Sequence, residues 1–289
     1  MTSQLVALCF DANDPMHLAR FWAEALRWKV GDETDDVVSI LPTDGTRFGL
    51  DFGAVPEPKG PWTNRLHLDL TTTSLDDQRE TVERLIEFGG RHIDIGQGPD
   101  VKHVVLADPE GNEFCIIEPT NNFLSTCGRF GSITCDGTRE VGYFWSAALG
   151  WPLVWDQDDE TAIRAPDLTG PMITWGGAPL NPKLGKNRLH LDIAPNDGID
   201  QQAEVDRLVS LGATRIDIGQ GDVGAQHYFP GRSLAPVLTR QEREELEAEL
   251  RLGRPRRPLV EWDHDGITSR LAVRLVLEAL AGNANARKA

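Results

Sequence analysis

The chain lacks any long apolar run and has few cysteines. No stretch of its 289 residues is continuously apolar over anything near the roughly 18 residues that a membrane-spanning helix needs. The segment Met1 to Phe10 is too short and too uncharged for a secretory signal peptide. We therefore expect a cytoplasmic protein. Neither a CxxC pair nor a dense disulfide framework is present, so we expect reduced thiols at the four cysteines, Cys9, Cys115, Cys127 and Cys135.

Positive charge is also scarce. The chain has 29 Lys and Arg against 45 Asp and Glu, a formal charge of −16, and the acidity lies in the part up to Phe229, where 18 basic residues face 36 acidic ones. Nucleic acids and anionic membranes are bound mainly through Lys and Arg, so the balance argues against both as partners. The composition, 40% hydrophobic and 26% charged, is typical of a soluble globular protein and excludes collagen, coiled coil and wholesale disorder.

An internal repeat organises most of the chain. Three strings return in altered form: FWAEALRW as FWSAALGW, NRLHLDL as NRLHLDI, and RHIDIGQG as TRIDIGQG. Each second occurrence starts 123 residues after the first, so the copies run in register. We predict two tandem domains with these boundaries: 1–122 (complete), 128–229 (last strands atypical or missing), and a C-terminal tail at 230–289.

Within one copy the hydrophobic period alternates between strand and helix. Asp14-Pro15 is typical of a helix start, and Ser74 is expected to open a second helix that Gly89-Gly90 ends. The strand 65–71 alternates strictly and places Arg65, His67 and Asp69 on one face, with three leucines on the other. Each copy is therefore predicted to be β-α-β-β-β twice over.

These motifs resemble the vicinal oxygen chelate superfamily, in particular its glyoxalase-like and bleomycin-resistance-like branch. The resemblance rests on the opening helix FWAEALRW, the segment PEPK…NRLHLDL, the helix end ERLIEFGG and the string ADPEGNEFC. It implies an α+β fold in which paired βαβββ modules form cup-shaped mixed sheets, and a concave face that holds a ligand. A short α/β tail would follow the two domains.

The resemblance also implies where a divalent metal would be bound. Its ligands would come from one position on the first strand and one on the last strand of each module. In copy one these positions fall at Ala7, Asp51, His67 and Cys115; in copy two they fall near Phe130, Thr174, His190 and Leu238. Alanine cannot ligate, and a single histidine per copy does not make a metal site. We therefore predict no cofactor and keep a divalent metal, with the weak ligands His67, Asp51 and Cys115, as an alternative.

The candidate ligand-binding residues lie on or beside the predicted polar face of the cup. His67 and His190 have a second interpretation, as half-buried sheet histidines bonded to their neighbours Asp69 and Asp192. Trp62 and Trp175 could instead be structural packing, and a lone strand histidine such as His103 is weak evidence of a site. The complete set is Arg65, His67, Asp69, His103, Arg188, His190, Asp192, Trp62 and Trp175.

Copy two departs from copy one after Gly221. The tail predicts a charged helix from Thr239 to Leu252, a strand from Leu259 to Trp262 and a helix from Thr268 to Ala281. LTRQEREELEAEL resembles the start of pterin carbinolamine dehydratases, but the histidine-rich motif of that family is missing, so we do not carry the activity over.

Three functions stay open at this point. The first is a metal-free glyoxalase-like protein that binds a small organic molecule, with copy one as the better candidate because it is complete. The second is a metal-dependent lyase, isomerase or dioxygenase of the superfamily, and the third is a non-catalytic scaffold or dimerisation module. We expect a small-molecule partner, no nucleic acid and no membrane, with a homodimer as an open assembly state; whether the chain is an enzyme is left open.

Overall fold

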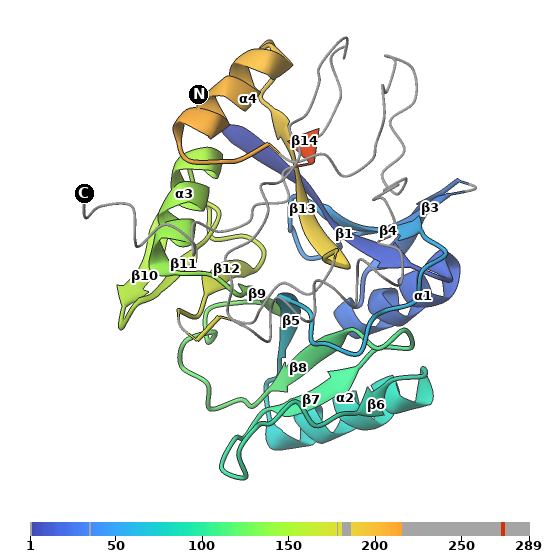
Figure 1. The fold of residues 1–289 in the computed structure, drawn as a ribbon. Helices are drawn as coiled ribbons and strands as arrows, with labels where there is room; N and C mark the ends of the chain where they lie inside the picture. The colour runs from blue at the N-terminus through green and yellow to red at the C-terminus, as the bar shows by residue number, and fades with distance from the viewer. Residues whose placement is uncertain (1, 35, 178, 181–185, 216–272, 275–289) are drawn as a thin grey trace, which may run out of the picture.

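The computed structural model describes residues 2–34, 36–177, 179–180, 186–215 and 273–274. These residues form successive modules that each begin with a strand followed by a helix (Figure 1). The first module contains β1 (Ser3–Ala12), α1 (Pro15–Leu26), β2 (Lys29–Glu33), β3 (Val37–Leu41) and β4 (Gly49–Ala54). The second contains β5 (Leu66–Thr71), α2 (Leu75–Glu87), β6 (Arg91–His92), β7 (Val104–Ala107) and β8 (Glu113–Ile117).

Copy two supplies the remaining elements. Its first module contains β9 (Phe130–Cys135), α3 (Arg139–Leu149), β10 (Leu153–Gln157), β11 (Glu160–Ile163) and β12 (Met172–Trp175). Its second module is described as β13 (Leu189–Pro195) and α4 (Gln201–Ser210), and the tail contributes β14 (Val273–Arg274). The predicted α+β fold is confirmed, with helices and mixed sheets in tandem modules.

The helix starts follow from the cap residues read in the sequence. The Asp14 side chain accepts a hydrogen bond from the backbone N–H of His17 at 3.0 Å, and Pro15 occupies the first helical position of α1. Ser74 caps α2 in the same way through the N–H of Asp77 at 3.0 Å. Both predicted helix starts are confirmed.

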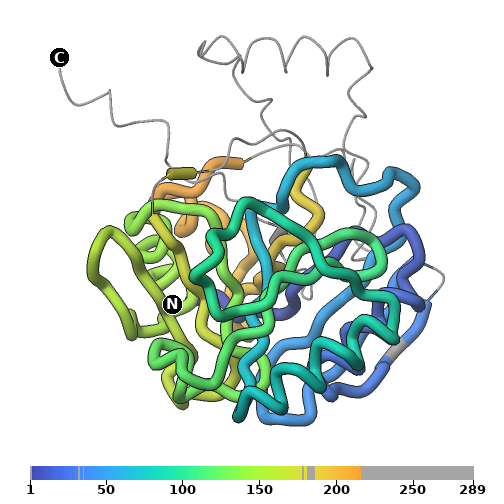
Figure 2. The backbone as a smooth tube through the Cα atoms, turned by 90° about the horizontal axis from the view of Figure 1, so that it is seen from below, coloured from blue at the N-terminus to red at the C-terminus, as the bar shows by residue number. Residues whose placement is uncertain are grey.

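The two sheets each combine strands from both copies. The six-stranded sheet has the order β14-β13-β1-β4-β3-β2, and the eight-stranded sheet has the order β10-β11-β12-β9-β5-β8-β7-β6. Strand β1 pairs antiparallel with β13, and β5 pairs antiparallel with β9. Figure 1 shows the blue β1 beside the yellow β13, and Figure 2 shows the third module (yellow-green) and the first (blue) on opposite sides of the second (teal).

This pairing corrects one expectation. Copy one does not form a cup from its own two modules, because the first strand of each module has its antiparallel partner in copy two. Module one joins the fourth module and module two joins the third. A site on either sheet is therefore built from residues of both copies.

One hydrophobic core joins the two sheets. Phe10 of the six-stranded sheet and Phe114 of the eight-stranded sheet both contact Trp22 of α1, with ring centroids 5.4 and 5.1 Å apart. The indole N–H of Trp22 donates to the buried carboxyl of Asp108 at 3.1 Å. The leucines of β5 lie in this core, as the alternation of the strand predicted: Leu66, Leu68 and Leu70.

The fourth module departs from the other three, as its sequence indicated. In the first three modules the first strand pairs in parallel with the last, whereas β13 pairs antiparallel with the two-residue β14 from the tail. The helix predicted over 268–281 is wrong at Val273–Arg274, which form a strand. The helix predicted over 239–252 and the strand predicted over 259–262 lie outside the described residues.

No helix among the described residues combines the length and the apolar character that crossing a bilayer would require.

Candidate functional site

Two transverse rows of side chains cross the eight-stranded sheet on one face. Residues paired directly across neighbouring strands point to the same face of a sheet, so the strand register identifies the residues that share a surface. The first row is Val105, Cys115, Asp69, Ser132 and Met172. The second row is His67, Thr134, Thr174, Ala162 and Trp155. We call these two rows site 1.

The centre of site 1 is a hydrogen-bond network around Asp69. One carboxylate oxygen of Asp69 accepts from the hydroxyls of Ser132 at 2.6 Å and Thr134 at 2.7 Å. The other lies 3.5 Å from Nε2 of His67. Thr174 donates in turn to the hydroxyl of Thr134 at 3.1 Å. The network therefore joins β5 of copy one to β9 and β12 of copy two.

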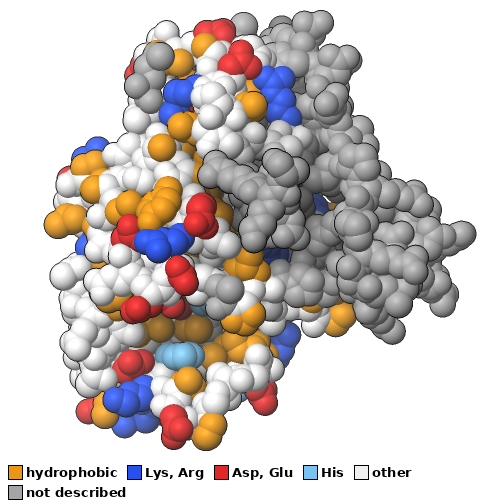
Figure 3. Space-filling model, turned by 60° about the vertical axis from the view of Figure 1, so that its left-hand side comes forward, with side chains coloured by type: hydrophobic (Ala, Val, Ile, Leu, Met, Phe, Trp, Pro, Cys, Tyr) orange, Lys and Arg blue, Asp and Glu red, His pale blue; other side chains and the backbone are white. Residues whose placement is uncertain are grey.

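Apolar side chains flank this polar centre. Val105, Cys115, Ile117, Leu124, Ala162 and Met172 form a buried cluster, against which Ile93, Cys127 and Trp155 pack. Figure 3, which brings the left side of Figure 1 forward, shows a hollow with hydrophobic side chains at its base and a histidine beside it. Site 1 thus combines a polar middle with apolar flanks, the usual composition of a small-molecule site.

The charges of site 1 are set by burial and by the His67–Asp69 contact. Burial alone would lower the pKa of His67, but hydrogen bonding to Asp69 and Cys115 outweighs it and raises the pKa well above its usual value. Burial opposes the ionisation of Asp69, yet its bonds to His67, Ser132 and Thr134 lower its pKa. Burial raises the pKa of the Cys115 thiol. At neutral pH site 1 holds an imidazolium–carboxylate pair beside a neutral thiol.

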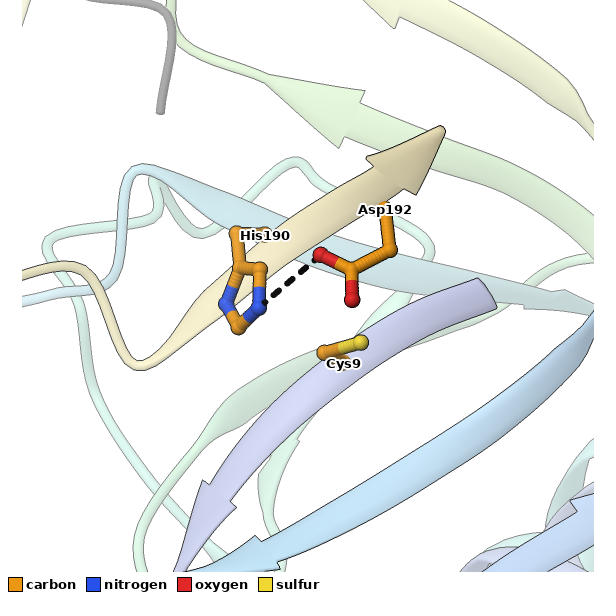
Figure 4. Close-up of side chains that lie close together, drawn as sticks. All are labelled: Cys9, His190 and Asp192. Atoms are coloured by element: carbon orange, nitrogen blue, oxygen red, sulfur yellow. Dashed lines mark ion pairs between the residues drawn. The ribbon is translucent and has the colours of Figure 1, made fainter. Parts of the chain in front are cut away.

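A second group of side chains lies on the six-stranded sheet. Cys9 pairs across the strands with His190 on one side and Asp51 on the other. A nitrogen of His190 lies 3.4 Å from a carboxylate oxygen of Asp192, and Figure 4 shows the Cys9 thiol of β1 beside both groups. We call Cys9, Asp51, His190 and Asp192 site 2. Burial and the nearby Asp192 raise the pKa of Asp51, although its bond from Ser39 at 2.6 Å opposes this.

The two sites differ as metal-binding groups. In each, one thiol, one imidazole and one carboxylate place ligand atoms within 4.8 Å of one another: His67, Asp69 and Cys115 in site 1, and Cys9, His190 and Asp192 in site 2. In site 1 the carboxylate is already occupied by two hydroxyls and an imidazolium, whereas a metal needs a neutral imidazole and a thiolate. Site 2 adds the adjacent carboxyl of Asp51, and its sulfur, nitrogen and oxygen donors suit Zn²⁺.

The weak metal set read from the sequence is divided between the sheets. His67 and Cys115 do come together in site 1, but Asp51 lies across from Cys9 and belongs to site 2. The grouping of Asp51 with His67 was wrong because β4 joins the sheet of β13 and not that of β5.

The two candidate arginines make structural ties. Arg65 lies 3.7 Å from a carboxylate oxygen of Asp136. Arg188 donates to the backbone carbonyl of Glu57 at 2.6 Å and pairs with Glu110 at 2.7 Å. Both guanidinium groups already have carboxylate partners, so nothing in these contacts adds them to a ligand site.

The candidate tryptophans and His103 make no contact with the Asp69 network that the structure records. Trp175 is 2% exposed and lies in the main core, because it follows Thr174 in the strand and therefore points to the opposite face. The placement of Trp175 beside the ligand site was wrong, and its interpretation as structural packing is confirmed. Trp62 is partly buried in the loop before β5, where its carbonyl accepts from Lys59 at 2.7 Å. His103 is partly buried and directly precedes β7.

Several residues of the sites escaped the sequence reading. Cys9, Ser132 and Thr134 are small side chains whose relevance depends on which strands pair. The signal that could have found Cys9 is the strand period, since Cys9 shares a face with Ala7, the position that was judged unable to ligate.

Comparison with known protein families divides the chain into the same two copies. The model of the glyoxalase-like domain family matches residues 7–117 and again 132–234. A glyoxalase I mutant from Zea mays is similar in structure, with a TM-score of 0.51 and 16% identity over 72% of this chain and 80% of that one. Unmutated glyoxalase I from Zea mays has the same TM-score of 0.51, with 15% identity over the same shares of the two chains. At these identities the likeness extends to the fold alone.

No curated protein matches the chain in sequence. The family model nevertheless covers more than half of the chain, in two copies that agree with the internal repeat, and the shared fold agrees with both. The chain belongs to the glyoxalase-like domain family of the vicinal oxygen chelate superfamily, with two copies of the domain.

Proposed function

We propose that the chain binds a small organic molecule at site 1, without a metal ion there. The observation that carries the proposal is the Asp69 network set between apolar side chains on one face of the eight-stranded sheet. A few convergent polar groups within an apolar surface give a ligand orientation and affinity together. The His67 side chain is 33% exposed, so a ligand can reach the polar centre.

The hydroxyls at site 1 then act through Asp69 to orient the imidazole of His67, which meets the ligand. Ser132 and Thr134 fix the Asp69 carboxylate, and Asp69 in turn holds the imidazole of His67. A positioned imidazolium donates a hydrogen bond and can also deliver a proton, so the arrangement serves binding and leaves acid catalysis open to the same residue.

Thermal unfolding with a panel of metabolites and antibiotics tests the proposal. A ligand at 100 times its Kd stabilises the fold by about 2.7 kcal/mol, which raises the melting temperature measurably. The His67→Ala variant should lose the rise. His92→Ala is the matched control, because His92 is exposed on the same sheet and pairs with Leu106, whose side chain lies in the core on the opposite face. An equal rise in His67→Ala, or no rise with any compound, would contradict binding at site 1, and the latter would favour a scaffold.

Site 2 supports a second candidate function, a metal-dependent enzyme. The specific observation is the buried cluster of Cys9, His190 and Asp192, with Asp51 beside it. Zn²⁺ held there would act as a Lewis acid that polarises substrate oxygens. The chain would supply the ligands, and the burial of all three would exclude water from them.

Metal analysis of the purified full-length chain separates the two candidates. Under the second function, one tightly bound metal ion per chain survives dialysis, and both Cys9→Ala and His190→Ala lose it while His92→Ala keeps it. A metal-free protein, or metal lost only on His67→Ala, contradicts a metal at site 2.

A further inference from the structure

We infer that the ligand of site 1 is an organic anion, an apolar molecule with one carboxylate or phenolate group. The inference rests on the proposed function, because it names the class of molecule that the same site would bind.

The first support comes from the positions at which the two copies differ. Three residues of β1 and β4 on the six-stranded sheet have counterparts 123 residues later on β9 and β12 of the eight-stranded sheet. Cys9, Asp11 and Asp51 correspond to Ser132, Thr134 and Thr174. Two carboxylates of the six-stranded sheet are thus replaced by hydroxyls in site 1. Site 1 therefore lacks two negative charges that the corresponding positions carry on the other sheet and that would repel an anion.

The remaining carboxylate of site 1 is fully engaged. Asp69 accepts from Ser132 and Thr134 on one oxygen and lies against His67 through the other. A ligand donor or cation would compete with these partners for Asp69. The hydroxyl hydrogens of Ser132, Thr134 and Thr174 are already donated within the network, so the donor that remains for a ligand acceptor is the imidazolium of His67.

Arg164 adds a positive charge that no carboxylate balances within the described part of the chain. The residue is 3% exposed, and the hydrogen bonds of its guanidinium go to neutral acceptors. Nε donates to the carbonyl of Gly170 at 3.1 Å, and both terminal nitrogens donate to the carbonyl of Thr126 at 3.3 Å. Nη1 also donates to the Thr126 hydroxyl at 3.2 Å. A buried charge without a counterion is costly, and an anion bound nearby would lower that cost.

Arg164 borders the apolar flank of site 1. It directly follows β11, and its guanidinium hydrogen-bonds to Thr126, the neighbour of Cys127 in the chain. It also acts electrostatically on Cys127, which packs against the apolar cluster of site 1. Lys59 pairs with Glu113 at 2.8 Å and Arg65 with Asp136 at 3.7 Å, whereas Arg164 has no carboxylate within ion-pair distance among the described residues.

Three probes of equal ring size test the charge preference: 2-naphthoate, 2-naphthamide and 2-naphthylmethylammonium. Isothermal titration of the full-length protein should give a Kd for naphthoate at least about tenfold below those of the amide and the ammonium ion. A protein with a formal charge of −16 would attract the cation if only its overall field mattered, so a preference for the anion reports the site itself.

Two variants locate the preference. Thr174→Asp restores the carboxylate that Asp51 provides on the other sheet, and Arg164→Met removes the unbalanced charge; each should bring the three Kd values to within about threefold. Gln201→Glu adds the same single charge at the N-terminus of α4, where the helix dipole favours it, and should keep the anion preference. Circular dichroism checks that each variant is folded. The comparison of the three probes on the wild-type protein does not depend on the variants.

The outcomes distinguish this inference from the function on which it rests. Equal or tighter binding of the amide or the ammonium ion overturns the anion preference and leaves small-molecule binding intact. A preference for naphthoate that survives in folded Thr174→Asp and Arg164→Met overturns its assignment to site 1. Failure of all three probes to bind, together with failure of the wider panel, overturns both.

Discussion

A fragment of residues 1–122 should not fold as a monomer, although it contains one complete sequence copy. In the full chain, β1 and β5 have antiparallel partners in β13 and β9, and both partners lie beyond residue 122. The fragment also loses large apolar side chains of copy two from the core that joins the sheets, among them Phe130, Ile133, Leu189, Leu191 and Ile193.

The magnitude follows from burial. Removing a Leu, Ile or Phe side chain from its apolar surroundings forgoes about 1.5–3 kcal/mol, so these five contacts account for roughly 8–15 kcal/mol. Whole domains are stable by only about 5–15 kcal/mol. The fragment should therefore be unfolded, or should associate with another chain that supplies the missing strands.

Light scattering after size-exclusion chromatography, together with amide NMR spectra, checks this prediction. Mixing the fragment with residues 123–289 should restore dispersed spectra at a 1:1 ratio. A monomeric fragment that unfolds cooperatively would refute the pairing of modules across the copies, and would support two separate cups.

Three further perturbations address the site and the core. Asp69→Ala should destabilise the fold by about 1–3 kcal/mol, because it removes the acceptor of the Ser132 and Thr134 hydroxyls, and it should lower the pKa of His67 toward its usual value in an NMR titration. In the wild type, the stabilisation that comes from protonated His67 is complete below about pH 6.5 and is lost as the pH rises through the pKa of His67 in the folded protein. Urea unfolding should show a weaker pH dependence of stability for Asp69→Ala. Burial raises the pKa of Asp108 to about 6, so stability should fall by about 2 kcal/mol between pH 4 and pH 6, and a flat profile would contradict this. Gly142→Ala would place a Cβ 2.1 Å from the Thr161 hydroxyl and should lower the melting temperature, whereas Gly176→Ala, which meets nothing within 4 Å, should leave it unchanged.

The sequence was sufficient for the local structure of each module. Helix caps act within a turn of the chain, so Asp14 and Ser74 identify their helix starts directly. The strand period likewise separates Leu68 from His67 and Asp69, and it predicts that the leucine is buried in the core.

The partner of β1 could not be predicted from the strands themselves. The string NRLHLD precedes or begins both β5 and β13, so β1 meets the same side chains in either partner. The choice between them depends on how the modules pack, as in the contacts of Trp22 with both sheets, and not on a local pattern. Since the sequence does not decide which strand pairs with β1, it does not decide which residues share a site. This is why Asp51 was grouped with His67.

A slip of one residue explains the error at Trp175. Adjacent residues of a strand point to opposite faces, so the placement of a tryptophan on a ligand face needs the register as well as the strand. Thr174 pairs with Thr134 and joins site 1, whereas Trp175 pairs with Cys135 and packs in the core. The repeat shows which residues of the two copies correspond, but it does not show which residues lie opposite each other on paired strands. It therefore could not predict this register.

The cross-pairing of modules also explains how two sites with different chemistry arise from one duplicated sequence. The His–Asp pair is the same in both sites, contributed by β5 in one and β13 in the other. The differences come from the opposing strands, where β1 and β4 supply Cys9 and Asp51 and β9 and β12 supply Ser132 and Thr174. A cup built within one copy would have kept each His–Asp pair with its own copy's residues. Because the copies exchange partners, a substitution in the first module changes the site that holds the histidine of the fourth, and the two candidate sites can diverge while the shared pair is retained.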